Sequence, residues 1–369
     1  MARHNAFTLD RPPGRICLFR LSAIGDCCHV VPVIRTLQTA FPDTHLTWIL
    51  GAAEASLFQD LDGVEIIAHN KKAGRRGLAR QLAGRSFDVL MLMQVALRAG
   101  LASRAVKAPC RLGFDQARSR DGHRLFINAR IPDASPGHVI DGFFDFLKPL
   151  SLTDPVMRWD IPIPARARRH AQQLIDDRPV LIISPCSSQR LRNYRNWRLE
   201  RYVALARHAI EVHAMQVMIT GAPGAESVRY AEAIEQACAG LSTPANSAQP
   251  VTNLVGQTDL KTLFALIDQA TAVVAPDSGP VHLAAAAGTP AIGLYATSNP
   301  DRTGPVRGQR WVVNAYPQAV RQAFGCDVDS IPWGKRVRDP AAMDFIEVNA
   351  VTDQLDRLLA TPPAERLSP

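Results

Sequence analysis

Short apolar runs alternate with longer stretches of helical character along the first half of the chain. The segments between the runs are rich in Arg and Ala, and Val30–Phe41 has helical spacing. A strand followed by a glycine turn and a helix opens a βαβ unit, and repeated alternation predicts a parallel, doubly wound sheet. The predicted strands are Arg15–Leu21, His45–Leu50, Val64–Ala68 and Val89–Met93.

The alternation stops at residues 151–179 and then resumes. Pro155, Pro162 and Pro164 predict an extended connector, which leads into a helix and a new start at Pro179. Beyond it the pattern predicts strands at Val180–Ser184, Gln216–Thr220, Thr252–Leu254, Ala272–Ala275 and Ala291–Tyr295, and helices at Leu199–Val212, Ala225–Ala237, Leu260–Ala270 and Gly279–Ala287.

The pattern predicts an α/β protein with two Rossmann-like domains that face each other across a cleft. A chain of 369 residues is too long to fold around a single hydrophobic core. We expect an N-terminal domain at residues 1–165, a second domain at 166–325, and a helical segment at 326–369 that packs back toward the first domain. Because ligands of open α/β sheets bind at the carboxyl ends of the strands, one site on each wall suits a reaction that joins two substrates.

Composition narrows the class of protein. The chain is 47% hydrophobic and 21% charged, which is ordinary for a globular protein. The apolar run around Val89–Leu97 is far shorter than the ~20 residues of a membrane span, and Met1–Arg15 lacks the apolar segment of a secretory signal. Seven cysteines without a Cys-x-x-Cys pair favour a reducing compartment over a disulfide framework or a zinc site. We therefore expect a cytosolic protein.

The net charge suggests a polyanionic partner. The formal charge is +8, from 42 Lys and Arg against 34 Asp and Glu. Residues 1–165 hold 21 basic and 15 acidic side chains, so most of the surplus lies in the first domain. Nucleic acid, an anionic membrane and a phosphorylated substrate would each fit such a field.

Residues Ala275–Pro290 carry the strongest local signal for an anion site. A predicted strand ends there in Asp277-Ser278-Gly279, and a helix of small residues begins at once. Ser278 or Asp277 can cap this helix, and its first amides and positive dipole end suit a phosphate or diphosphate. His282, in the first turn, would face the same ligand. The alternative is an ordinary helix cap with a packed histidine.

Two further loops follow predicted strands. Ser184–Ser188 offers hydroxyls, among them Ser187 and Ser188, and is followed by Arg190, Arg192 and Arg195. Hydroxyls and guanidinium groups at a strand end suit a phosphate, although a basic surface loop is an equal alternative. In the loop Gly221–Glu226, Glu226 can accept hydrogen bonds from ribose hydroxyls or simply begin a helix.

Asp26 is the candidate general base. It follows Gly25 at the end of the first strand, where a carboxylate could take a proton from a hydroxyl; the alternative is that it caps the next helix. Neither the P-loop pattern nor Gly-x-Gly-x-x-Gly is present, which argues against a P-loop kinase and a nicotinamide enzyme. The Asp-x-Asp triplets at Asp60–Asp62 and Asp327–Asp329 do not follow strands cleanly, so no metal site is assigned.

Together these residues resemble a known family. Arg20–Asp26 (RLSAIGD), Asp277–His282 (DSGPVH) and Gly288–Pro290 (GTP) are similar in sequence and order to motifs of the ADP-heptose:lipopolysaccharide heptosyltransferases, glycosyltransferase family 9. The resemblance covers about residues 15–307 and is greatest to the branch that adds the first heptose to a phosphorylated Kdo. It includes Arg111–Asp115 (RLGFD), His138–Asp141 (HVID) and Leu254–Thr258 (LVGQT).

The resemblance implies a GT-B fold, with an N-terminal acceptor domain, a C-terminal nucleotide-sugar domain and a last helix that crosses back. It also implies inversion at the anomeric carbon without a covalent intermediate, with Asp26 at the position of the catalytic base. Ser278, Gly279 and His282 match the diphosphate site, Glu226 the ribose ligand, and Asp277 a position that serves the sugar or orders the loop. The donor-binding residues implied are Ser187, Ser188, Arg195, Glu226, Thr258, Asp277, Ser278, Gly279 and His282.

Two positions depart from the family pattern. Arg195 stands two residues before Trp197, where many relatives have Lys, and a planar guanidinium makes different contacts from an ammonium. Gln257 takes the place of a frequent Lys, which weakens a phosphate role there.

The expected substrates are ADP-heptose and the lipid A–Kdo acceptor, with no cofactor and no metal needed for the chemistry. Helix amides and Arg195 would stabilise the departing ADP. The basic residues Lys71, Lys72, Arg75 and Arg76 would hold the protein peripherally on the anionic, cytosolic face of the inner membrane.

Three alternatives remain at this stage. The acceptor could be an existing heptose, or the protein could be a nucleotide-sugar epimerase or hydrolase of the same architecture. A basic nucleic-acid-binding protein is the non-enzymatic alternative, but the sequence lacks a helix-turn-helix, a zinc finger and an RNP-type aromatic motif.

Overall fold

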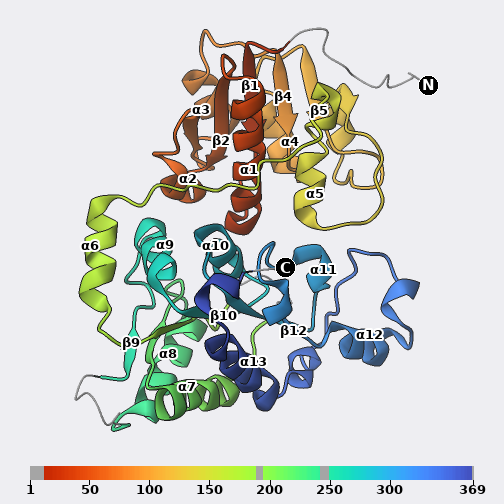
Figure 1. Ribbon diagram of the computed structural model, residues 1–369. Coiled ribbons are helices and arrows are strands. Elements are labelled where there is room, and N and C mark those ends of the chain that lie inside the picture. Colours follow the sequence, from red (N-terminus) through yellow and green to blue (C-terminus); the bar gives the residue numbers. More distant parts are fainter. Residues whose placement is uncertain (1–11, 188–193, 242–248, 368–369) are drawn as a thin grey trace. The chain divides into compact units, whose positions relative to one another are not determined.

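The computed structural model describes residues 12–187, 194–241 and 249–367. The chain divides into two compact units, Met1–Pro162 and Ile163–Pro369, three residues before the boundary expected from the sequence. Each unit contains one six-stranded parallel sheet with helices between the strands (Figure 1). Within the described residues, no helix has both the length and the hydrophobicity to cross a membrane.

The sheet of the first unit has the order β3-β2-β1-β4-β5-β6, and all its pairs are parallel. The chain therefore starts in the middle of the sheet, builds outward to one edge, and returns to build the other half. The strands are β1 (Arg15–Phe19), β2 (His45–Gly51), β3 (Glu65–His69), β4 (Val89–Leu92), β5 (Cys110–Gly113) and β6 (Ala129–Arg130). The helices are α1 (Ile24–Ala40), α2 (Ala52–Phe58), α3 (Gly74–Gln81), α4 (Leu97–Ser103) and α5 (Val139–Phe144).

The second unit repeats this topology. Its sheet order is β12-β11-β10-β7-β8-β9, so the chain again starts in the middle of the sheet, builds outward to one edge and then builds the other half. The strands are β7 (Val180–Ile183), β8 (Gln216–Ile219), β9 (Val251–Asn253), β10 (Ala272–Pro276), β11 (Ala291–Tyr295) and β12 (Val313–Asn314). The helices are α6 (Ala165–Leu174), α7 (Leu199–His213), α8 (Ala225–Cys238), α9 (Leu260–Gln269), α10 (Gly279–Ala287), α11 (Pro300–Thr303), α12 (Tyr316–Phe324) and α13 (Val348–Ala360).

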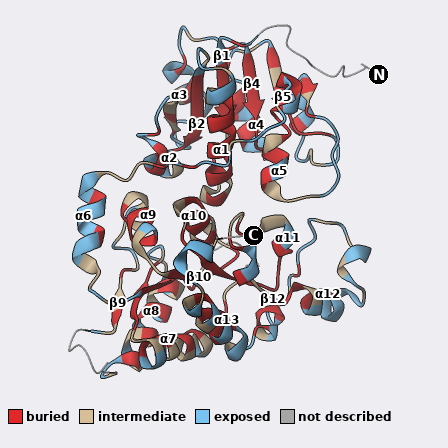
Figure 2. Ribbon diagram, viewed as in Figure 1, coloured by how far each residue is buried: buried red, intermediate tan, exposed pale blue. Residues whose placement is uncertain are grey.

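Both sheets are buried on both faces, as parallel sheets are (Figure 2). Every residue of β7, β8, β10 and β11 is buried, whereas the helices expose their outer sides. This is why the central strands read as continuous apolar runs. All seven cysteines are free thiols.

Helix α1 begins at Ile24, so the predicted start at Val30 is wrong. The cause is burial: nearly every residue from Gly25 to Leu37 is buried, so no exposed polar face marks where the helix begins. The consequence is functional, because Asp26 lies in the first turn of the helix instead of before it.

The C-terminal helix α13 belongs to the second unit. Its residues Val351, Leu355 and Leu358 are fully buried in that unit's core, and the helix packs on α7. The expectation that residues 326–369 also pack toward the first domain stays a prediction.

Candidate active site

The strand order of the first unit reverses between β1 and β4, and open α/β sheets bind ligands at such a switch point. The segments that follow these two strands are tied together. The Leu21 amide donates to Gln94 Oε1 at 2.8 Å, and Gln94 Nε2 donates to Ser22 Oγ at 3.4 Å. Arg98 Nη2 also reaches Ser22 Oγ at 3.4 Å. The loop that leads into α1 is therefore held in place by residues that follow the neighbouring strand, β4.

Asp26 projects from this helix start and forms an ion pair with Arg20 through Oδ2. It does not cap the helix: the N-cap residue is Ala23, without a side-chain cap bond. The Asp26 side chain is 32% exposed, whereas that of Arg20 is 14% exposed. Arg20 Nη1 donates to the Met93 carbonyl at 2.6 Å, and its guanidinium lies 5.3 Å from the centre of the Phe143 ring. A fixed guanidinium thus orients a solvent-accessible carboxylate.

Gly51, at the end of β2, permits the close approach of this loop. Its amide donates to the Leu21 carbonyl at 3.0 Å. A Cβ at this position would lie 2.5 Å from that backbone oxygen, closer than any side chain tolerates. The residue must be glycine for the loop after β1 to keep its path.

The basic residues Lys71, Lys72, Arg75 and Arg76 are all exposed and follow β3. Because all strands of the sheet are parallel, this places them at the same carboxyl edge as the loop before Asp26. Their role in docking stays a prediction.

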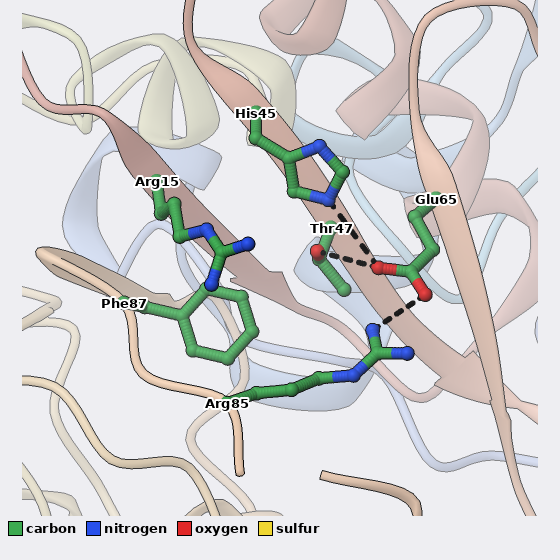
Figure 3. A pocket seen from close by; sticks show the side chains of 6 residues that line it. All are labelled: Arg15, His45, Thr47, Glu65, Arg85 and Phe87. Atoms are coloured by element: carbon green, nitrogen blue, oxygen red, sulfur yellow. Dashed lines mark hydrogen bonds and ion pairs between the residues drawn. The ribbon is translucent and has the colours of Figure 1, made fainter.

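A pocket of about 380 Å³ lies elsewhere in the first unit (Figure 3). Its lining comes from the beginnings of β1, β2 and β3 and from the segment before β4, which lie at the opposite edge of the sheet from Asp26. Its carboxylate, Glu65, already accepts from Arg85 and from Thr47 Oγ1 at 3.2 Å. The hydrogen bond from Arg85 holds the pKa of Glu65 below its usual value. Glu65 is therefore ionised, with its charge balanced by Arg85, and it lies at the opposite edge of the sheet from Asp26. It does not take part in the transfer chemistry expected at Asp26.

The switch point of the second unit lies between β7 and β10, and Asp277 follows β10 directly. The Asp277 residue is buried, and its Oδ2 accepts from Ser298 Oγ at 2.7 Å. Arg195 Nη1 donates to the Asp277 carbonyl at 2.8 Å and lies 3.8 Å from Oδ2, and Arg336 Nη2 lies 3.7 Å from the same oxygen. Asp277 therefore orders two cationic side chains that come from distant parts of the chain.

The first turn of α10 fits the predicted anion site, although the predicted side-chain capping is wrong. Ser278 is the N-cap residue, but its hydroxyl donates to the Pro276 carbonyl at 3.0 Å and makes no cap bond. Asp277 is engaged by Ser298 instead. The amides after Gly279 are thus not consumed by a side-chain cap, and half-buried His282 lies in the same turn.

One asparagine joins the loop after β7 to the first turn of α8, the helix that follows β8. The Ser187 amide donates to Asn196 Oδ1 at 2.9 Å, and Asn196 Nδ2 donates to Glu226 Oε2 at 2.9 Å. Ser187 and Glu226, which are both expected to contact the donor, are therefore linked to each other through Asn196. Ser188, Arg190 and Arg192 lie outside the described residues.

Thr258 lies in the next loop along the edge. The Gly256 amide donates to the Gly221 carbonyl at 2.9 Å, which joins the loop after β9 to the loop that leads into α8 and Glu226. Thr258 is half-buried there. Gln257 Nε2 donates to the Asn253 carbonyl at 2.8 Å, so this side chain turns back on its own strand.

Sequence reasoning assigned no role to three polar residues of this site: Asn196, Ser298 and Arg336. Ser298 had a signal, because it lies in a polar loop directly after a predicted strand. Arg336 had none, since it is 59 residues from Asp277; the Val337 amide, which donates to the Thr297 carbonyl at 3.0 Å, helps to bring this segment to the site.

Comparison with known proteins identifies the class of enzyme to which these loops belong. The sequence model of glycosyltransferase family 9 (heptosyltransferase) matches residues 75–327, more than half of the chain. The chain belongs to this family. It is therefore a glycosyltransferase of the heptosyltransferase type, not the epimerase or the nucleic-acid-binding protein that the sequence alone left open.

Individual relatives agree with the family. The enzyme is 37% identical over 350 residues to the lipopolysaccharide core heptosyltransferase OpsX of Haemophilus influenzae, which covers 94% of this chain and 97% of the relative. A solved family 9 glycosyltransferase from Veillonella parvula aligns with a TM-score of 0.72 at 20% identity, covering 94% of this chain and 97% of that one. E. coli heptosyltransferase WaaC with ADP aligns with a TM-score of 0.71 at 18% identity, covering 93% and 99%. The predicted α/β class with two Rossmann-like domains, and its assignment to GT-B, are confirmed.

Proposed function

We propose that this enzyme transfers a heptose from ADP-heptose to the inner core of lipopolysaccharide. The observation that carries the proposal is the 37% identity to a lipopolysaccharide core heptosyltransferase over almost the full length of both chains. The ordered polar loops at the carboxyl edges of both sheets support it, since each switch point carries residues suited to one substrate.

The second unit binds the donor in this proposal. The amides at the start of α10, with Ser278, Gly279 and His282, receive the diphosphate, and Arg195 adds a positive charge held by the Asp277 carbonyl. Glu226 accepts hydrogen bonds from the ribose hydroxyls, while Ser187, Ser188 and Thr258 complete the nucleotide site. The presence of ADP in the solved E. coli WaaC supports an ADP-linked donor.

Asp26 acts as the general base in the first unit. Its carboxylate takes the proton from an acceptor hydroxyl as that oxygen forms a bond to the anomeric carbon of the heptose. The bond from this carbon to the diphosphate breaks on the opposite face, ADP departs with the electron pair, and the configuration inverts. Helix amides and Arg195 stabilise the charge that develops on ADP, so no metal is required.

The acceptor is a Kdo residue of lipid A–Kdo, and it is phosphorylated if the enzyme belongs to the branch that adds the first heptose. Lys71, Lys72, Arg75 and Arg76 then hold the enzyme on the cytosolic face of the inner membrane. An existing heptose is the competing acceptor, and it would meet the same basic unit.

Purified enzyme, ADP-heptose and defined acceptors test the proposal. Incubation with Kdo-lipid A, phospho-Kdo-lipid A and heptosylated lipid A, followed by mass spectrometry, is expected to show addition of one heptose to a Kdo acceptor. Addition only to heptosylated lipid A would move the enzyme to a later step. Release of free sugar or an epimer from ADP-heptose alone would contradict transfer. EDTA is expected to leave most of the activity, and an absolute Mg²⁺ requirement would overturn the metal-free account.

A further inference from the structure

Two histidines and an aspartate meet at a second place in the second unit. His208 and His213 lie on α7, and Asp356 lies on α13. The Nε2 atoms of the two histidines lie 2.7 and 2.6 Å from the same oxygen, Asp356 Oδ1. The imidazole rings are 5.4 Å apart at an angle of 69°. The side chains of His208, His213 and Asp356 are 24%, 22% and 43% exposed, so solvent reaches all three.

The packing of the two helices holds this cluster together. Helix α13 lies against α7 (Figure 1). Its Val351 and Leu355 are fully buried in the core of the unit. His213 is the last residue of α7, where Ala214 in the left-handed conformation ends the helix. The three groups are therefore fixed by backbone that is ordered for other reasons, which is the condition for a preformed site.

The donor set is that of a transition-metal site. Each side chain offers one ligand atom, and the three atoms all lie within 4.8 Å of one another. Imidazole nitrogen and carboxylate oxygen are ligands of Zn²⁺ and its neighbours, whereas Mg²⁺ and Ca²⁺ prefer oxygen alone. Ligand atoms of a tetrahedral zinc site lie ~3.3 Å apart. The two Nε2 atoms lie 2.7 and 2.6 Å from Asp356 Oδ1, so the half-buried Asp356 side chain must draw back from both rings to make room for an ion, and water can take the fourth position.

The cluster is separate from the donor loops. Helix α7 starts after the loop that follows β7, at the carboxyl edge of the sheet, and runs back to the edge where β8 begins. His213 is three residues before Gln216, the first residue of β8. It therefore lies at the opposite edge from Asp277 and α10. An ion there would act on the structure, not on the departing ADP.

We propose that His208, His213 and Asp356 form a binding site for one divalent transition-metal ion of the zinc class, which fastens α13 to α7. The ion binds the Nε2 lone pairs of both rings and one Asp356 oxygen; each ring keeps its hydrogen on Nδ1, and any further ring proton is released to solvent. This site goes beyond the transferase function and is independent of it.

The test uses the full-length, tag-free enzyme after dialysis against EDTA. ZnCl₂ is titrated by isothermal calorimetry, and CoCl₂ is followed by visible absorption, which reports four- or five-coordinate Co²⁺. The variants are His213→Gln and Asp356→Asn, and the matched control is His170→Gln, an exposed histidine on α6. We expect the wild type and His170→Gln each to bind one more equivalent of Zn²⁺ per chain than His213→Gln and Asp356→Asn. Zn²⁺ is expected to raise the melting temperature of the first pair only, and MgCl₂ to have no effect.

Equal zinc stoichiometry and affinity in the wild type and both site variants would overturn the proposal and leave the cluster as an ion pair. Transferase activity of the EDTA-dialysed enzyme is measured in parallel. Because the site lies away from the donor loops, its loss would leave that activity intact, so failure of this proposal and failure of the proposed function are distinguishable.

Discussion

Arg20 and Asp26 form an ion pair across the turn that joins β1 to α1, and Arg20 is itself held by the Met93 carbonyl after β4. One guanidinium thus links the two strands of the switch point to the carboxylate proposed as the base. The pair uses Oδ2 of Asp26, and within the described residues no hydrogen bond or ion pair engages Oδ1. This arrangement fixes the carboxylate and leaves an oxygen for a substrate proton.

Asp26→Asn is expected to abolish transfer without loss of donor binding. An amide has nearly the same shape but cannot accept the proton, and general-base catalysis contributes about 10²- to 10⁴-fold. Turnover is measured by release of ADP and donor binding by calorimetry. Asp43→Asn, at an exposed aspartate in the loop after α1, is the matched control. Near-normal turnover of Asp26→Asn would refute the assignment of the base.

Arg20→Lys separates charge from positioning. Lysine keeps the positive charge, but its single ammonium group cannot reproduce the fork that meets the Met93 carbonyl and Asp26 together. We expect kcat to fall by about tenfold or more, as a misplaced base would produce, with little change in the affinity for ADP. If the donor affinity falls and kcat is kept, Arg20 has a different role from the positioning one.

Arg195→Gln is expected to weaken ADP binding. The guanidinium is ordered by the Asp277 carbonyl, and a hydrogen bond to a charged group contributes about 1.5–3 kcal/mol. This corresponds to roughly 10- to 100-fold in the dissociation constant of ADP. Arg195→Lys should recover part of the loss, since it restores the charge. Arg207→Gln, an exposed arginine on α7, controls for the lost positive charge and should bind ADP normally.

The stability of the first unit should fall in acid because of His123. This side chain is buried, and its Nε2 accepts from the Phe114 amide at 3.2 Å, which requires the neutral ring. Burial, with a smaller effect from the charge of Arg130, lowers the pKa of His123 from 6.5 to about 4. Below pH 6.5 the unfolded chain takes up a proton that the folded unit does not. The contribution of neutral His123 to the free energy of unfolding is therefore fully present above pH 6.5. It is lost as the pH falls toward 4, which lowers the free energy of unfolding by about 3 kcal/mol.

Denaturant unfolding of the wild type and of His123→Gln between pH 4 and pH 7 measures this term. Glutamine can still accept from the Phe114 amide but does not titrate, so the difference in free energy of unfolding between the two proteins should shrink as the pH falls. A difference that stays constant with pH would exclude His123 as the titrating group.

How far the sequence predicts this structure depends on local signals. The limits of α10 and β11 agree with the prediction to the residue, because glycine and proline bound short apolar runs there. Strands β5, β6 and β12 were not predicted, because Arg111 interrupts the apolar run of β5 and the other two have only two residues each. The site loops were predictable because they follow strong strands. The contacts of Arg336 and Asn196 were not, because they depend on tertiary packing between segments far apart in the chain.

The exposed residues Lys71, Lys72, Arg75 and Arg76 give the last prediction. Each basic side chain near an anionic bilayer contributes about 1 kcal/mol, and this contribution is screened by salt. Replacement of all four by Gln should therefore reduce activity on acceptor embedded in anionic vesicles and remove most of its salt dependence. Activity on a short, detergent-free soluble acceptor should be unchanged, because none of the four lies in the Arg20–Asp26 contact network. If transferase activity on acceptor in vesicles changes neither with salt nor with the substitutions, these residues do not dock the enzyme on the membrane.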